Sequence, residues 1–209
     1  MTLLADNYVD RIDFFKYLPQ TDCRECGAGS CQEFVDDLKQ GRKRPEDCPD
    51  ISESLYYPFQ VALDADKILP EFPCLTAPRP GSTGLTEINT PDDASPILVS
   101  GNNFHTQDVI TAVLGTTKSP FFLLFADTRG DTVDMAVILE SLTVDVIRSE
   151  VVKSRILERS SHQEIVIPGL ASAMRDGLRE STGWKVTVGP ICAAELPLFF
   201  GGRWLPPVT

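Results

Sequence analysis

Basic residues are in the minority in this chain of 209 residues. Lysine and arginine together number 19, against 30 aspartates and glutamates, and the formal net charge is −11. A surface that follows the phosphates of a nucleic acid needs clustered Lys and Arg side chains. The composition therefore excludes nucleic acid as the expected partner.

Long apolar runs and targeting signals are also missing. The longest uninterrupted apolar run covers only residues 121–126, whereas a membrane-spanning helix needs about 20 predominantly apolar residues. Residues 1–20 mix acidic with hydrophobic side chains and show neither the basic start nor the cleavage site of an export signal. We therefore expect no membrane association and a cytoplasmic, reducing location.

The glycine motifs of nucleotide-binding proteins are absent as well. Neither G-x-G-x-x-G nor G-x-x-x-x-G-K-[ST] occurs in the sequence. Loops of these two kinds cradle the phosphates of dinucleotides and of nucleoside triphosphates. A nucleotide cofactor is therefore not indicated, which weakens the hypothesis of a flavin- or nucleotide-linked iron–sulfur reductase.

Four of the six cysteines, in contrast, fall close together. They follow the spacing C-x2-C-x4-C-x16-C and are Cys23, Cys26, Cys31 and Cys48. Disulfides are disfavoured in a reducing compartment, so this spacing indicates a metal centre held by thiolates. The remaining two, Cys74 and Cys192, are interpreted as buried thiols that pack like small hydrophobic side chains. For Cys192, at the start of the last predicted helix, a contact with a ligand is the alternative.

Zinc and an iron–sulfur cluster are the two candidates for this centre. Zinc ribbons usually show two separated C-x2-C pairs. Here three cysteines are bunched, and the fourth, Cys48, is distant and followed by Pro49. This arrangement is typical of ligands to a cubane cluster. We therefore favour a [4Fe–4S] cluster and keep zinc as the alternative.

The chain divides into three parts by composition. Residues 1–60 form a predicted helical cluster module, which begins with a short amphipathic helix within residues 6–18. Residues 61–96 are interpreted as a Pro-rich linker or extended strap, because residues 70–96 contain six prolines. Residues 97–209 are predicted to form a second domain.

Short apolar runs alternate with helical patterns in that second domain. The predicted strands cover residues 97–100, 121–126, 164–167 and 185–188. The predicted helices run from about Thr106 to Gly115, over 132–157 with a break before an N-cap at Thr143, up to about Gly183, and from about Cys192. We therefore predict an α/β fold, namely a small doubly wound (Rossmann-like), mostly parallel four-stranded sheet preceded by the helical iron–sulfur module.

Ligands of open α/β sheets bind at the carboxyl ends of the strands. In this sequence those ends are the predicted turns at 101–103, 127–130, 168–171 and 189–190, which are small and rich in exposed backbone amides. A large neutral ligand would suit such an edge. The same residues are also compatible with ordinary strand-to-helix turns that bind nothing.

The cysteine segment resembles a known module. From Leu18 it reads L-P-x-T-x-C-x-x-C-G-x-x-x-C, and Phe34, Leu38, Gly41 and Cys48-Pro49 follow. It resembles the amino-terminal iron–sulfur module of the large (gamma) subunit of the corrinoid iron–sulfur protein, which belongs to the acetyl-CoA decarbonylase/synthase system. The resemblance implies the same four cysteines as ligands of a [4Fe–4S] cluster.

The second domain resembles the carboxy-terminal cobalamin-binding domain of the same subunit. The matching segments are residues 99–102, 127–133, 167–171 and 182–190. In that family a TIM barrel separates the two modules, and only the Pro-rich residues 70–96 stand in its place here. This chain is therefore not expected to be a simple equivalent of that subunit.

The resemblance implies a cobalamin across the strand ends, with its cobalt near the helix that starts at Thr132. His105 and His162 lie outside the D-x-H-x-x-G pattern of histidine-ligated corrinoid proteins, so a base-off cobalamin is expected. Met135 falls near the lower face of the cobalt or, alternatively, is a core residue. The expected contacts are Asn102, Asn103, Thr106, Thr128, Gly130, Thr132, Val133, Met135, Pro168, Gly169, Leu170, Ala171, Gly189 and Pro190.

The favoured function is electron transfer and methyl carriage in anaerobic one-carbon metabolism. The cluster would reduce a corrinoid, and the partners would be a methyltransferase or other corrinoid-pathway proteins and a redox donor. The chain would then be a carrier rather than a stand-alone enzyme. The alternative is a non-catalytic partner or assembly protein that docks on a corrinoid protein and uses its cluster structurally.

Overall fold

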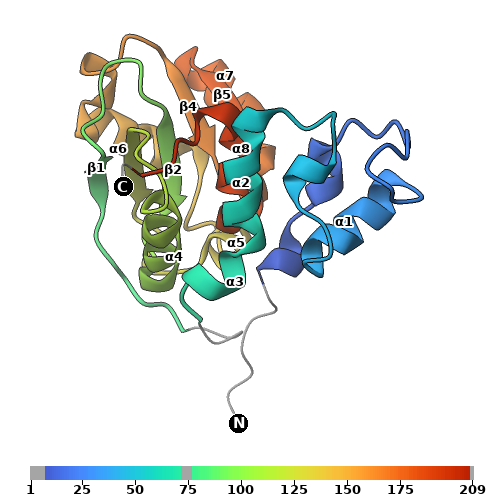
Figure 1. Cartoon of the computed structure of the whole chain (residues 1–209). Helices are drawn as coiled ribbons and strands as arrows, with labels where there is room; N and C mark the ends of the chain where they lie inside the picture. The colour runs from blue at the N-terminus through green and yellow to red at the C-terminus, as the bar shows by residue number, and fades with distance from the viewer. Residues whose placement is uncertain (1–7, 72–76, 208–209) are drawn as a thin grey trace.

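The most apolar stretch of the sequence forms the centre of the sheet. In the computed structural model, which describes residues 8–71 and 77–207, strand β3 (Phe121–Ala126) has all six residues buried. Its neighbours are β1 (Gly84–Ile88) and β2 (Ile97–Gly101), and the sheet continues with β4 (Glu164–Ile167) and β5 (Lys185–Val188) in the order β1-β3-β2-β4-β5 (Figure 1). A strand buried on both faces needs apolar side chains at every position.

All neighbouring strands run parallel except β1, which pairs antiparallel with β3. The carboxyl ends of β2, β3, β4 and β5 therefore meet at one edge of the sheet. The four predicted strands and the α/β class are confirmed. The predicted strand number is wrong, because the sheet has a fifth strand, β1, within the segment that was interpreted as a linker.

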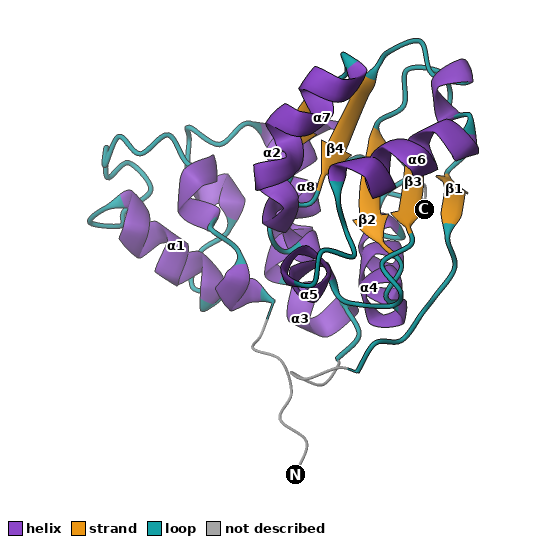
Figure 2. Ribbon diagram, turned by 180° about the vertical axis from the view of Figure 1, so that it is seen from behind, coloured by secondary structure: helices purple, strands orange, loops and turns teal. Residues whose placement is uncertain are grey.

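Helices cover both faces of the sheet. Alternate side chains of β3 point into two separate cores, with Phe121, Leu123 and Phe125 in one and Phe122 and Leu124 in the other. The second core is closed by α5 (Val133–Ile138), α6 (Val144–Ser154) and α7 (Arg175–Thr182) (Figure 2). The first is closed by α2 (Glu53–Leu63), α4 (Phe104–Leu114) and α8 (Leu196–Phe200).

Side-chain caps fix the starts of two of these helices. The side chain of Asn103 accepts a hydrogen bond from the Thr106 amide, so α4 begins at Phe104, slightly earlier than predicted. Thr143 caps α6 in the same way through the amide of Val146, which confirms the predicted N-cap. Such a side-chain oxygen satisfies an amide that the helix itself leaves unpaired.

The amino-terminal part lies beside the α2 and α8 side of the molecule (Figure 1). It consists of the 3-10 turns η1 (Val9–Arg11), η2 (Phe14–Tyr17) and η3 (Pro45–Asp47) and of α1 (Cys31–Lys39), and it leads into α2, which is followed by α3 (Ala65–Ile68). Two 3-10 turns therefore replace the single helix predicted within residues 6–18.

The helix predicted to end near Gly183 also differs at its start. The region after β4 begins with a 3-10 helix, η5 (Gly169–Met174), before α7.

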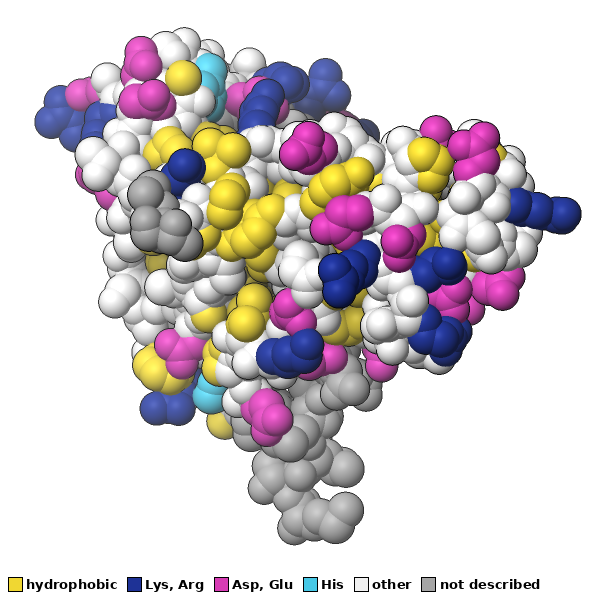
Figure 3. Space-filling view, in the orientation of Figure 1, with side chains coloured by type: hydrophobic (Ala, Val, Ile, Leu, Met, Phe, Trp, Pro, Cys, Tyr) yellow, Lys and Arg dark blue, Asp and Glu magenta, His cyan; other side chains and the backbone are white. Residues whose placement is uncertain are grey.

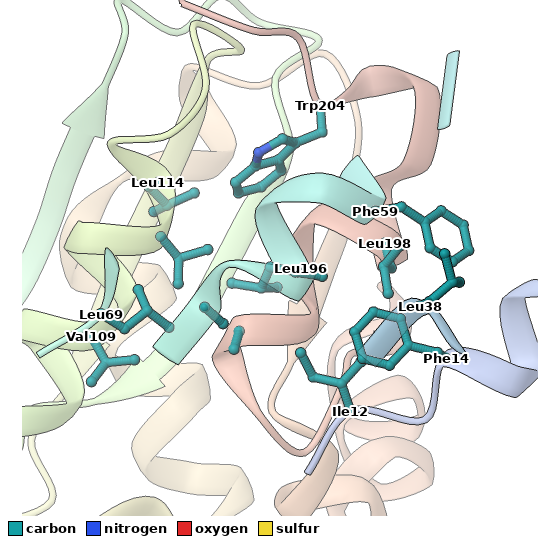
Figure 4. Close-up of a cluster of buried hydrophobic side chains, with 14 of the residues drawn as sticks. Ile12, Phe14, Leu38, Phe59, Leu69, Val109, Leu114, Leu196, Leu198 and Trp204 are labelled. Atoms are coloured by element: carbon teal, nitrogen blue, oxygen red, sulfur yellow. The ribbon is translucent and has the colours of Figure 1, made fainter. Parts of the chain in front are cut away.

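One hydrophobic core joins this amino-terminal part to the sheet. Ile12, which directly follows η1, and Phe14, the first residue of η2, lie in the same buried cluster as Leu196 and Leu198 of α8 (Figure 4). The ring of Phe14 lies 6.2 Å from that of Phe59 on α2, measured between centroids. On the face of the molecule that Figure 1 presents, apolar side chains are also visible at the surface between charged ones (Figure 3).

No helix within residues 8–71 and 77–207 is long and apolar enough to cross a membrane. Cys74, which was interpreted as a buried thiol, lies outside the described residues. The three-part division at residues 60 and 96 stays a prediction. The shared core and the pairing of β1 with β3 nevertheless show close packing across both of those positions.

We predict that Asn102→Ala destabilises the fold. The Asn102 side-chain oxygen accepts hydrogen bonds from the Thr128 amide, the Thr128 hydroxyl and the Gly130 amide at 2.9, 3.0 and 3.2 Å. Removing the acceptor leaves buried donors unpaired, so the free energy of unfolding should fall by about 2–4 kcal/mol. Urea denaturation followed by circular dichroism measures the change. The exposed Thr111→Ala on α4 is the control and should stay within about 0.5 kcal/mol; equal stability of the two variants would contradict the prediction.

Candidate functional site

The cysteine segment wraps through an unusual backbone. Asp22, Arg24 and Gly27 all have positive φ angles, of 50°, 64° and 78°. Left-handed conformations are uncommon outside glycine and persist only where the surroundings hold them. Here the Asp22 carboxylate accepts a hydrogen bond from the Cys31 amide at 2.7 Å, and the Arg24 guanidinium donates to the Gly29 carbonyl at 3.2 Å. The loop is therefore built to bring its cysteines around a tight turn.

The third and fourth cysteines occupy defined positions at helical termini. Cys31 is the first residue of α1, whose N-cap Ser30 accepts a hydrogen bond from the Glu33 amide. Cys48 directly follows η3 and is buried. Burial raises the pKa of the Cys48 thiol, while the backbone amides of Asp50 and Ile51, which hydrogen-bond to it, act in the opposite direction.

A lysine joins the two cysteine-bearing segments. Lys43, in the turn between α1 and η3, donates to the carbonyl of Cys26 at 2.7 Å. Cys31 and Cys48 are buried, Cys26 is half-buried and Cys23 is exposed. Within the parts of the chain that the structure describes, no three His, Cys, Asp or Glu side chains are grouped so as to hold a metal ion. The four-cysteine ligand set stays a prediction, and its donor chemistry fits the thiolates and amide donors that an iron–sulfur cluster requires.

A cavity of about 840 Å³ lies at the carboxyl ends of the strands. Ser100, Ile167 and Gly189, at or just after the ends of β2, β4 and β5, form its base. Side chains of α4 and the start of α5 form further walls. The volume lies within the range of about 300–1,000 Å³ that is usual for small-molecule and cofactor sites. The open edge predicted from the sequence is therefore a large cavity.

The cavity brings together eight of the predicted contact residues. These are Thr106, Thr132, Val133, Met135, Pro168, Leu170, Gly189 and Pro190. Met135 is 40% exposed, so it lies at the cavity and not in the core, which was the alternative for this residue. The other predicted contacts are absent from the cavity lining and are Asn102, Asn103, Thr128, Gly130, Gly169 and Ala171.

Those six residues hold the surrounding loops in shape. The Asn102 side chain binds Thr128 and the Gly130 amide, as described above. The Gly130 carbonyl in turn accepts hydrogen bonds from the Asn103 side chain at 2.7 Å and from the Arg79 amide at 2.9 Å. Gly130 has a φ of +81°, and a Cβ there would lie 2.3 Å from the nitrogen of Pro80. The Pro-rich segment therefore packs across the loop after β3 as a strap.

The loops after β4 and β5, on the other side of the cavity, also contact each other closely. The Gly169 amide donates to the Pro190 carbonyl at 2.9 Å, and a Cβ on Gly169 would lie 2.7 Å from the nitrogen of Ile191. Glycine is required there because the loops after β4 and β5 touch through their backbones. Ala171 is completely buried in the core beneath.

Several cavity residues were not predicted as contacts. Tyr8 and Arg11 reach the cavity from the amino-terminal turn η1, and His105 reaches it from α4. Cys192, for which a ligand contact was the alternative to a buried thiol, is half-buried and also lines the cavity. Burial raises the pKa of the Cys192 thiol, and nearby Arg11 opposes that shift. No local sequence signal links residues 8–11 to strand ends that lie far along the chain.

The fold and the two sites define an α/β protein with a ligand cavity at its strand ends and a cysteine-rich module at its amino terminus. The chain belongs to the CO dehydrogenase/acetyl-CoA synthase delta subunit family, whose model matches residues 67–200. A family model of an Fe–S cluster domain matches residues 18–49, which contain all four clustered cysteines. Both matches agree with the resemblance found in the sequence.

Curated relatives are similar over part of their length. The gamma subunit of the acetyl-CoA decarbonylase/synthase complex from Methanopyrus kandleri is 32% identical over 122 residues, and that from Archaeoglobus fulgidus is 28% identical over 123. The corrinoid/iron–sulfur protein large subunit from Moorella thermoacetica is 30% identical over 115 residues. The matched regions cover 58%, 59% and 55% of this chain and 26% of each relative. The chain thus matches about a quarter of the length of these relatives.

We predict that Cys48→Ser loses most of the bound iron. A serine hydroxyl is a poor substitute for a thiolate at a cluster corner, and Cys48 is the one predicted ligand outside the loop. Iron and acid-labile sulfide per chain, measured on anaerobically prepared protein, should fall several-fold. Cys192→Ser is the matched control, because Cys192 lies outside the cysteine segment, and should keep the wild-type iron content. Equal iron in both variants would remove Cys48 from the ligand set.

Proposed function

We propose that this chain is a corrinoid iron–sulfur protein of the carrier type. A [4Fe–4S] cluster held by Cys23, Cys26, Cys31 and Cys48 would serve the reduction of a base-off cobalamin in the strand-end cavity. The observation behind the proposal is that one chain joins a four-cysteine segment to a cavity of about 840 Å³ at the edge of an α/β sheet.

The cavity is suited to a large, mostly neutral ring. Apolar side chains from three directions line it, including Val99 from β2, Val109 from α4 and Leu170 from η5. The rim residues Pro168, Gly189 and Pro190 add small side chains. A flat ring system gains from burial against such apolar walls.

The cluster module is suited to low-potential electron transfer. Backbone amides that point at ligand sulfurs tune the potential of a cluster, and Cys48 accepts such hydrogen bonds. Cys23 is exposed, which leaves one side of the module open to a redox donor. The partners we propose are such a donor and a methyltransferase or another protein of anaerobic, cytoplasmic one-carbon metabolism. The relatives from Methanopyrus kandleri and Archaeoglobus fulgidus are named as subunits of a complex.

A second candidate is a non-catalytic partner that docks on a corrinoid protein. One observation favours it: large apolar side chains are exposed, namely Ile138 at 71% and Leu139 at 57% at the end of α5, and Ile191 at 70% in the cavity lining. Exposed apolar patches mark protein contacts. A redox-silent cluster together with a tight protein partner would support this candidate over the carrier.

Anaerobically prepared protein tests the proposal. Iron analysis, followed by titration with hydroxocobalamin at micromolar concentrations, should give bound corrinoid with a base-off absorption spectrum. The Co(II) form should show no nitrogen splitting in electron paramagnetic resonance, because no histidine would ligate the cobalt. His105→Ala is the control for that point, since His105 lines the cavity, and its spectrum should match the wild type. Iron without cobalamin binding would contradict the corrinoid half of the proposal.

A further inference from the structure

We infer that the cavity is a composite site in which the segment leading to the cysteine loop forms one wall, with Arg11 binding hydrogen-bond acceptors at the corrinoid edge. This inference rests on the proposed corrinoid function. It adds a ligand contact from outside the α/β domain and couples ligand binding to the position of the cluster module.

Arg11 is chemically distinct from the rest of the wall. Among the described residues that line the cavity, it is the one lysine or arginine, and Asp134 is the one acid. A guanidinium presents five N–H donors and no acceptor. Burial raises the pKa of both Tyr8 and Cys192. Arg11 lies close enough to both groups for its positive charge to oppose that rise. The three side chains therefore form one polar corner of a largely apolar cavity.

The segment that presents Arg11 is fixed at both ends. At its start, the Tyr8 hydroxyl donates to the Pro70 carbonyl at 2.6 Å, and the Tyr8 amide donates to the Asp66 carboxylate beside it. At its end, the Tyr17 hydroxyl donates to Glu195 at 2.7 Å, and Lys16 forms an ion pair with the same carboxylate. A wall anchored in this way is preorganised, so a ligand does not have to order it on binding.

Apolar burial holds the middle of the segment. Ile12 and Phe14 are 3% and 1% exposed, and both belong to the core that contains α8 (Figure 4). Glu195 precedes α8, is only 3% exposed and is absent from the cavity lining. Glu195 therefore acts on the cavity through the segment, as a positioning residue.

The chemistry that Arg11 would recognise is an acceptor on the ligand edge. The corrin ring of cobalamin carries amide side chains, and its nucleotide tail carries a phosphate. Both present oxygen acceptors to a guanidinium, which binds phosphates and carbonyls well. Cobinamide has the amide side chains but lacks the nucleotide tail with its ribose and base. Comparing the two ligands therefore separates the two sources of the acceptor.

Equilibrium titration of the full, cluster-containing chain with cobalamin and with dicyanocobinamide tests the inference. Arg11→Ala should weaken cobalamin binding about tenfold, the size expected for one lost hydrogen bond to a charged donor. Arg11→Lys should recover part of the affinity. Glu195→Gln should weaken binding about threefold by loosening the wall, with the cavity lining unchanged. A loss for cobalamin alone assigns the contact to the nucleotide tail, and a loss for both ligands assigns it to the ring amides.

The controls are matched in residue type and lie away from the cavity. Arg148→Ala removes an exposed arginine of α6. Glu87→Gln, on β1, removes an exposed ion pair with Arg159. Both should bind cobalamin like the wild type, and thermal unfolding should show all variants folded. Wild-type affinity in folded Arg11→Ala and Glu195→Gln would overturn the inference while leaving the proposed function intact. A wild-type chain that binds neither ligand would overturn the proposed function, and the inference with it.

Discussion

The burial of Ile12 and Phe14 against α2 and α8 is the interaction on which the arrangement of this molecule depends. These side chains belong to the amino-terminal segment, yet they complete a core that continues to Leu123 and Trp204. Full burial of a large apolar side chain contributes about 1.5–3 kcal/mol. A segment as small as the cysteine module could not build an adequate core from its own residues. Its fold is therefore supported by the α/β domain as well as by any bound cluster.

The same packing has a functional consequence. Because residues 8–17 are anchored at Pro70 and at Glu195, the chain enters the cysteine loop from a fixed point beside the strand-end cavity. Modules joined by a small interface move relative to one another by default. The continuous core favours a fixed position of the cysteine module relative to the cavity. A fixed position would give each electron transfer from cluster to ligand the same geometry.

The sequence predicted the parts of the fold that have strong local signals. Residues 121–126 are apolar at every position because β3 is buried on both faces, and Thr143 caps a helix by its side chain. β1 was missed because it is short and partly exposed and lies in a stretch rich in prolines. Its pairing with β3 is a tertiary contact that no local pattern encodes.

The candidate site was predictable to a similar degree. The spacing of the cysteines and the loops after the strands pointed to the two regions that the family models match. Asn102 and Gly130 could not be separated from ligand contacts by sequence alone, because a loop that binds a ligand and a loop that binds its own backbone need the same residue types. Tyr8 and Arg11 could not be predicted at all, since only folding brings them to the cavity.

The central claim is that the cluster serves a corrinoid held in the same chain. Rapid mixing of the anaerobic, cobalamin-loaded protein with a one-electron reductant, followed by absorption of the cluster and of Co(I), tests it most directly. The account predicts that Co(I) forms after cluster reduction in a first-order step whose rate constant does not change with protein concentration. A rate that rises in proportion to protein concentration, or Co(I) that forms equally fast in a cluster-free variant, would contradict it.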